Sequence, residues 1–303
     1  MSAEKKYIKI PYPVIFSIVL SVLLLLAGCT EKNEYFINSG INLPLKESLV
    51  IKVSIESTSM DREMPCNIYF PAGYGDGRDF PVWYSLHGHG SNESMWINAG
   101  ITRTADKLIS ENQITPLIMV FPYTKEADAK EIRADWEEDG KFGERNIDKF
   151  ISQGLVDYID SHFDTVKSAE ERYIGGFSKG GAIALRVAFH HPNLFSRVGG
   201  YSPALISSDY SKTQFEKWLY PNDDPDKIKD TAKFAAKKGF TKLSIYLDAG
   251  NANDPFSAGV QSLQPALEKR GIQSEFHLYE GGHSLEHNNG DFSAYLEFYA
   301  GAE

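Results

Sequence analysis

The pentapeptide Gly-Phe-Ser-Lys-Gly at 176–180 constrains the fold of this chain more than any other feature. A short apolar segment leads into it, and apolar residues recur at helical intervals from 182 to 189 after it. A turn that joins a strand to a helix this tightly has no space for bulk at its flanks, and Gly176 and Gly180 meet that requirement. The sequence therefore predicts a nucleophile elbow, in which Ser178 is lifted clear of a β-sheet.

Strand-like and helix-like segments alternate along the rest of the chain. The expected strands are 49–56, 66–70, 80–86, 117–121, 197–200, 242–249 and 273–279, and the expected helices include 104–110, 147–159, 255–271 and 292–300. This alternation predicts an α/β fold with a mostly parallel central sheet and helices on both faces. In such a sheet the functional loops lie beyond the carboxyl ends of the strands. Ser178, Asp254 and His283 all follow predicted strands, so they can meet at one edge. His89 follows a further predicted strand.

The first 28 residues have the composition of a targeting segment. Three lysines within the first nine residues precede an apolar run from 14 to 26, which is too short to span a bilayer comfortably. The run ends in Leu-Ala-Gly-Cys at 26–29, which resembles the lipobox of bacterial lipoproteins. That resemblance implies a signal peptide over 1–28, cleavage before Cys29 and lipid attachment to Cys29. Thr30 resembles the residue found in signals sent to the outer membrane of Gram-negative bacteria. A generic secretory signal and an uncleaved anchor are the alternatives.

Residues 29–48 are polar and without periodicity, and we interpret them as a tether ahead of a single domain over 49–303. The chain has two cysteines. If Cys29 carries lipid, Cys66 has no partner for an intramolecular disulfide and is expected to be a small buried residue in a strand. The formal net charge of −10 argues against nucleic acid or an anionic lipid surface as the ligand of the globular part.

A serine hydroxyl needs a base within hydrogen-bond reach, and that base needs an orienting carboxylate. His283 lies in a glycine-rich turn directly after the last predicted strand, and Asp254 lies in the loop after the preceding strand. The order Ser, Asp, His is the one expected of α/β-hydrolases. Asp254 is favoured because it has the longer loop needed to reach the histidine. Asp248, at the end of a strand, is the alternative acid, because strand-end registers are easily misjudged by a residue or two.

Two backbone N–H groups are predicted to hold the oxyanion that forms during attack on a carbonyl. That of Lys179 stands at the start of a helix, and that of His89 lies in the turn after a strand. The Lys179 side chain could favour anionic substrates, or it could face solvent on the first turn of the helix. The residues His-Ser-Leu-Glu-His at 283–287 also match a zinc pattern. The glycines before it and Asn-Asn-Gly after it disfavour the helix that zinc binding requires, so we expect neither a metal nor a cofactor.

These motifs together resemble the putative esterase family of α/β-hydrolases, which includes esterase D, feruloyl esterases and the antigen 85 mycolyltransferases. The likeness covers about 51–298 and is carried by Leu-His-Gly-His-Gly-Ser at 86–91 with Trp96, the elbow at 176–181, Asn253-Asp254, and Gly-Gly-His at 281–283. The resemblance implies that Ser178 is the nucleophile, Asp254 the acid and His283 the base. It also implies that His89 and Lys179 are the oxyanion donors.

The sequence therefore predicts a lipid-anchored serine esterase that acts outside the cytoplasm at the bacterial outer membrane. The relatives suggest feruloyl or acetyl esters of plant-type polysaccharides as substrates. Trp96, Tyr201 and Trp136, the last within a polar insertion at 124–145, are candidate walls for an aromatic acyl group or a sugar. Two alternatives are an acyltransferase that uses the same triad with an alcohol acceptor, and a non-catalytic carbohydrate-binding lipoprotein.

Overall fold

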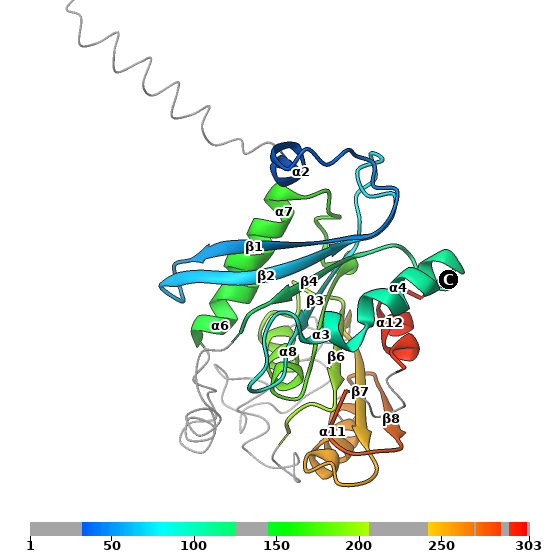
Figure 1. Ribbon diagram of the computed structural model, residues 1–303. Helices are drawn as coiled ribbons and strands as arrows, with labels where there is room; N and C mark the ends of the chain where they lie inside the picture. The colour runs from blue at the N-terminus through cyan, green and yellow to red at the C-terminus, as the bar shows by residue number, and fades with distance from the viewer. Residues whose placement is uncertain (1–31, 125–144, 206–241, 270, 286–290, 302–303) are drawn as a thin grey trace, which may run out of the picture.

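The computed structural model describes residues 32–124, 145–205, 242–269, 271–285 and 291–301 (Figure 1). The predicted signal peptide, the lipidation site Cys29 and the candidate wall Trp136 lie outside these residues. Within the described part of the chain, no helix has the length and apolar character needed to cross a membrane.

A single sheet organises the described residues, with eight strands in the order β1-β2-β4-β3-β5-β6-β7-β8 (Figure 1). The strands are β1 (Leu49–Ser57), β2 (Arg62–Phe70), β3 (Val82–Leu86), β4 (Ile118–Pro122), β5 (Arg172–Phe177), β6 (Arg197–Tyr201), β7 (Ser244–Gly250) and β8 (Ser274–Tyr279). The β1–β2 and β2–β4 pairs are antiparallel, and every later pair is parallel. β3 and β4 are buried along their whole length, as the continuous apolar runs of central parallel strands require. The prediction of a mostly parallel sheet is confirmed.

Helices cover both faces of this sheet. They are α2 (Glu34–Asn38), α3 (Met95–Ala99), α4 (Ile101–Ser110), α6 (Arg145–Lys149), α7 (Val156–His162), α8 (Lys179–His190), α11 (Ser257–Glu268) and α12 (Ser293–Ala300). A π-helical segment, Phe150–Leu155, joins α6 to α7. One core layer lies between the sheet and α7, α8 and α11, and a second, rich in aromatic residues, lies under α3, α4 and α12. Adjacent strand residues such as Trp83 and Tyr84 belong to different layers, because successive side chains of a strand point to opposite faces.

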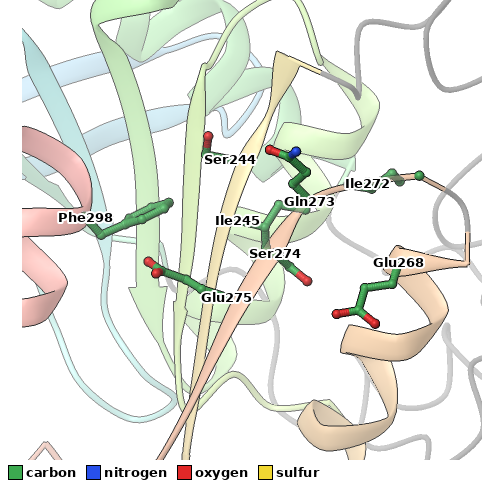
Figure 2. A pocket seen from close by; sticks show the side chains of 9 residues that line it. Ser244, Ile245, Glu268, Ile272, Gln273, Ser274, Glu275 and Phe298 are labelled. Carbon is green, nitrogen blue, oxygen red and sulfur yellow. The ribbon is translucent and has the colours of Figure 1, made fainter.

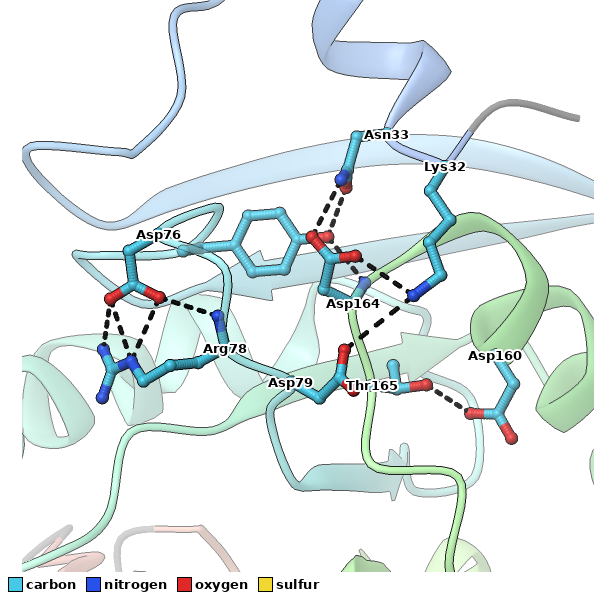
Figure 3. A network of polar contacts seen from close by, with 9 residues as sticks. Lys32, Asn33, Asp76, Arg78, Asp79, Asp160, Asp164 and Thr165 are labelled. Atoms are coloured by element: carbon cyan, nitrogen blue, oxygen red, sulfur yellow. Dashed lines mark hydrogen bonds and ion pairs between the residues drawn. The ribbon is translucent and has the colours of Figure 1, made fainter.

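The segment predicted to be a tether packs against the domain from residue 32 onward (Figure 3). Phe36 is fully buried, with its ring 5.0 Å from that of Phe70 and 5.4 Å from that of Tyr74. The Nδ2 of Asn33 donates to an Asp164 carboxylate oxygen at 2.9 Å, and the Lys32 ammonium lies 3.2 Å from the other oxygen. The described part of the expected tether over 29–48 thus packs on the domain, because one aromatic anchor and a few paired polar groups fix a segment of otherwise polar composition.

Candidate active site

Ser178 occupies the sharp turn between β5 and α8, with φ 54° and ψ −121°. A non-glycine residue rarely adopts this conformation, so the surrounding structure must impose it. The Ser178 N–H donates to the carbonyl oxygen of Tyr201 at 3.0 Å, and its carbonyl accepts from the N–H groups of Ala182 and Ala204 at 3.1 and 2.9 Å. The serine backbone is thus held by its own helix and by the strand beside it.

The two elbow glycines are required by close backbone approaches. A Cβ on Gly176 would lie 2.5 Å from the Gly180 carbonyl carbon, and one on Gly180 would lie 2.5 Å from the Leu86 carbonyl oxygen. Real Cβ atoms essentially never approach backbone this closely. The sequence-based reason for glycine at both positions is confirmed, and the crowding extends to the end of β3.

The His283 imidazole faces the serine, with its Nε2 2.8 Å from Ser178 Oγ. Its ring stacks on Phe177, with centroids 4.9 Å apart, and meets Phe256 edge-on at 4.8 Å. About a fifth of the imidazole stays exposed. Two aromatic rings therefore fix the plane of the imidazole while one side remains open to a reactant.

The loops after β7 and β8 lie side by side, which brings the acid to the histidine. The Asn251 N–H donates to the Tyr279 carbonyl oxygen at 2.8 Å, and the Ala252 N–H donates to that of Gly281 at 2.9 Å. A Cβ on Gly250 would lie 2.4 Å from the same Gly281 oxygen, so only glycine fits there.

The Asp254 carboxylate is fully buried, and its nearest approach to His283 joins Oδ1 to Nδ1 at 3.4 Å. Oδ1 accepts the N–H of Phe256 at 3.0 Å, and Oδ2 accepts the N–H of Gly250 at 3.0 Å and the hydroxyl of Ser202 at 2.5 Å. Burial disfavours the charged form, but the nearby His283 imidazole and the hydrogen bonds from Ser202 and the two N–H groups outweigh it and hold the pKa of Asp254 below its ordinary value. Asp254 is an anion at neutral pH.

The alternative acid, Asp248, occupies a different position. It is completely buried, and its Oδ1 accepts the backbone N–H of Ser202 at 2.7 Å. Of the two candidate carboxylates, the structure places Asp254 against His283.

Ser202 is the residue of this site that the sequence analysis did not single out. It is fully buried, has φ 43°, and its Oγ lies 2.8 Å from His283 Nδ1 as well as 2.5 Å from Asp254 Oδ2. No motif marks it. The available signal was its place directly after β6, because the register pairs Tyr201 with Phe177 and so sets the residues after them side by side.

The turn that follows β3 lies against the elbow. A Cβ on Gly88 would lie 2.8 Å from the Phe177 ring. His87 is buried, its Nε2 accepts the Thr124 N–H at 3.0 Å, and its Nδ1 lies 2.8 Å from the Gly88 carbonyl oxygen. Nδ1 therefore carries the proton, and burial lowers the pKa of His87, so its imidazole is neutral. His89, the predicted oxyanion donor, follows in this turn and is exposed.

The side chain of Lys179 is buried, with 9% of the residue exposed. The alternative of a solvent-facing lysine on the first turn of α8 is therefore wrong. Its charge helps to lower the pKa of His87, after the larger effect of burial.

The prediction that Trp96 and Tyr201 form open walls for a substrate is wrong. Each is 1% exposed, and the two rings pack edge-on at 5.8 Å within the aromatic core layer. The Trp96 Nε1–H donates to the Leu86 carbonyl oxygen at 3.1 Å. Sequence alone cannot say whether an aromatic residue near a site faces the core or the solvent.

A cavity of about 750 Å³ lies at the opposite end of the sheet (Figure 2). Ser244 and Ile245 at the start of β7, Ser274 and Glu275 at the start of β8, and Phe298 of α12 contribute to its lining. Since Ser178, Asp254 and His283 follow the other ends of their strands, this cavity is separate from their site. The described residues hold no group of His, Cys, Asp or Glu side chains that could bind a metal. His283 itself lies in a bend, while Glu286 and His287 of the zinc-like pattern fall outside the described residues.

Residues 57–299 match the sequence profile of the putative esterase family. The chain belongs to that family. It is 27% identical over 261 residues to an endo-1,4-beta-xylanase/feruloyl esterase of Xylanibacter ruminicola, an alignment that covers 80% of this chain and 32% of that protein. The chain thus spans about a third of the length of this relative. The predicted family is confirmed.

Solved structures agree on the fold. A ferulic acid esterase superposes with a TM-score of 0.65 at 19% identity, covering 84% of this chain and 98% of the other. A ferulic acid esterase from Anaeromyces mucronatus in complex with ferulic acid superposes with a TM-score of 0.61 at 16% identity, covering 85% and 90%. The predicted α/β-hydrolase fold is confirmed.

Proposed function

We propose that this protein is a serine carboxylic-ester hydrolase with Ser178 as nucleophile, His283 as base and Asp254 as acid. One observation carries the proposal: the Ser178 hydroxyl, in its imposed elbow conformation, lies 2.8 Å from His283 Nε2. That distance lies within the reach over which a base removes a proton. The family supports the same chemistry.

The proposed reaction has two stages. Ser178 Oγ attacks the ester carbonyl carbon while His283 Nε2 takes its proton, and the carbonyl oxygen becomes an oxyanion. The backbone N–H groups of His89 and Lys179 donate to that oxyanion from the β3 turn and the start of α8. Collapse expels the alcohol with the proton from His283. Water then loses a proton to His283 and attacks the acyl-enzyme, which releases the acid and restores the Ser178 hydroxyl.

For the substrate we propose feruloyl or acetyl esters of carbohydrates. Two observations support an acyl group of this kind: the relative named as a xylanase/feruloyl esterase, and the similar fold that is bound to ferulic acid. The fifth of the His283 imidazole that remains exposed gives such an ester access to the base.

For the location we propose a lipid anchor at Cys29 on the bacterial outer membrane. Lys32, three residues after Cys29 in the sequence, pairs with Asp79 and Asp164, which precede β3 and β5 (Figure 3). Ser178 follows the other end of β5, and six strand residues span about 20 Å. The anchor would therefore hold the amino end of the sheet near the membrane and turn the site toward the aqueous phase, which favours a polymer outside the membrane over a lipid within it.

The test of the activity is hydrolysis of p-nitrophenyl acetate and methyl ferulate by the purified protein and by Ser178→Ala. We expect the variant to lose at least about 10³-fold in kcat. A fluorophosphonate probe should label the wild type and not the variant. Turnover that is unchanged in Ser178→Ala would reject the proposed function, and product analysis with sugar acceptors would reveal acyl transfer in place of hydrolysis.

A further inference from the structure

The hydroxyl of Ser202 lies between the proposed base and the proposed acid. Its Oγ is 2.8 Å from His283 Nδ1 and 2.5 Å from Asp254 Oδ2, whereas the direct approach of Nδ1 to Asp254 is 3.4 Å. We propose that Ser202 is a positioning residue. Through its hydroxyl, Asp254 orients the His283 imidazole and stabilises its charged form. This inference rests on the proposed function and adds a fourth member to its chain of hydrogen bonds.

The direction of each hydrogen bond follows from which atoms carry protons. A carboxylate only accepts, so the single Ser202 proton points to Asp254 Oδ2. The Ser202 oxygen then accepts, and the proton that it accepts is on His283 Nδ1. This fixes the imidazole as the Nδ1–H tautomer and leaves the Nε2 lone pair facing the Ser178 hydroxyl at 2.8 Å. Ser202 therefore selects the tautomer in which His283 can act as a base.

Several contacts hold Ser202 in a backbone conformation that is unfavourable for a non-glycine residue. Its φ of 43° is unusual for a residue with a side chain. The buried Asp248 carboxylate accepts its N–H at 2.7 Å, and two residues later the Ala204 N–H donates to the Ser178 carbonyl at 2.9 Å. Asp248, the rival acid in the sequence, thus acts on the site through the Ser202 backbone.

The linkage matters most when the imidazole becomes charged. As Ser178 attacks, the proton moves to Nε2, and the Nδ1–H bond to Ser202 becomes a charge-assisted one, which is stronger. No proton needs to reach Asp254. Without the hydroxyl, the Nδ1–H would face its nearest carboxylate oxygen across 3.4 Å, beyond the usual range of an N–H···O bond. Ser202 is fully buried, so it cannot touch the substrate.

The test compares Ser202→Ala with Ser202→Gly. Both variants remove the hydroxyl, but glycine adopts positive φ readily and alanine does not, so backbone strain differs between them. Ser85→Ala is the matched control, because Ser85 is 1% exposed and its Oγ contacts no partner among the described residues. The concentration of active sites is measured with a fluorophosphonate probe, and kcat is calculated from it, so that misfolded protein does not lower the kcat value.

We expect kcat for p-nitrophenyl acetate to fall about 10- to 100-fold in both Ser202 variants, with KM changed less than about twofold. The acid limb of the pH–rate profile should move to lower pH in both, because the imidazolium loses its hydrogen-bonded link to the carboxylate. The carboxylates of Asp254 and Asp248 both accept hydrogen bonds from Ser202, and both carboxylates remain in the variants. Ser85→Ala should match the wild type.

Wild-type kcat in either Ser202 variant would overturn the inference, as would a loss seen in Ser202→Ala and absent from Ser202→Gly. A lowered kcat with an unmoved pH profile would also overturn it, since that result indicates a purely structural role. In each of these cases the active wild type would leave the proposed function standing. A wild type that neither hydrolyses esters nor reacts with the probe would reject both proposals.

Discussion

Substitution of Trp96 tests whether this aromatic residue near the site has a structural role or binds the substrate. Its indole is buried, donates to the Leu86 carbonyl at 3.1 Å, and packs against Trp83 and Tyr295. Leu86 ends β3 and leads into the turn that carries His89. Trp96→Phe therefore removes a hydrogen bond that holds this turn and leaves unfilled core space, without changing any surface that a substrate could reach.

The expected cost follows from these two losses. The hydrogen bond contributes about 0.5–1.5 kcal/mol to the free energy of unfolding. The smaller ring leaves a cavity that costs about 1–2 kcal/mol more. For a domain of this size, each kcal/mol lowers the melting temperature by about 2–4 °C. We therefore expect Trp96→Phe to melt about 3–14 °C below the wild type.

The measurement combines thermal unfolding followed by circular dichroism with steady-state kinetics well below both melting temperatures. Tyr35→Phe, which alters a half-exposed ring on α2, serves as the control and should stay within about 0.5 kcal/mol of the wild type. KM should change less than about twofold in Trp96→Phe. A variant with an unchanged melting temperature and a clearly raised KM would refute this reasoning and restore Trp96 as a substrate wall.

Two further predictions concern the stability of the fold at acid pH and the proposed lipid anchor at Cys29. Burial opposes ionisation of Asp148, but hydrogen bonds from two histidines at the end of α8 outweigh it and hold the pKa of Asp148 below its ordinary value. The contribution of the ionised Asp148 carboxylate to the free energy of unfolding is therefore fully present above about pH 4 and is lost as pH falls further. Asp148→Asn should lower the free energy of unfolding in urea by about 1–3 kcal/mol at pH 7 and by less at pH 3. An equal cost at both pH values would contradict this. Metabolic labelling with a palmitate analogue in a Gram-negative host should mark the wild type and not Cys29→Ala, and an unlabelled wild type would contradict the lipid anchor.

The elbow and the alternation of strands and helices could be predicted because their signals are local. Glycines on either side of Ser178 and the change from strand to helix periodicity lie within a few residues of one another. The same holds for the glycine-rich turn before His283. Loop length favoured Asp254 over Asp248, and the structure places Asp254 against the histidine.

The remaining features depend on contacts between distant segments, which no local pattern encodes. Ser202 joins the site because β6 lies between β5 and β7, so its neighbours are fixed by sheet register. Trp96 and Tyr201 face the core because of the side of the sheet on which α3 and β6 place them. Phe36 binds its segment to the domain through rings contributed by Phe70 and Tyr74, which follow it by more than thirty positions.

The strained elbow is held from both faces of the sheet. On each face, a glycine without a side chain allows the close packing that holds it. On one face, α8 approaches β3 closely enough that Gly180 cannot carry a side chain. On the other, a Cβ on Gly175 or Gly199 would lie 2.1 Å from the Tyr299 hydroxyl, so the bare strands admit the tyrosines of α12.

Those tyrosines add hydrogen bonds where the strain is stored. The Tyr295 hydroxyl accepts the Gly176 N–H at 3.1 Å and donates to the Gly199 carbonyl at 2.9 Å. A residue in a sparsely populated backbone conformation costs about 1–3 kcal/mol. Two hydrogen bonds of about 0.5–1.5 kcal/mol each are of the size needed to offset that cost. The last helix of the chain therefore stabilises the conformation that presents Ser178 to His283, although it contributes no residue to the site itself.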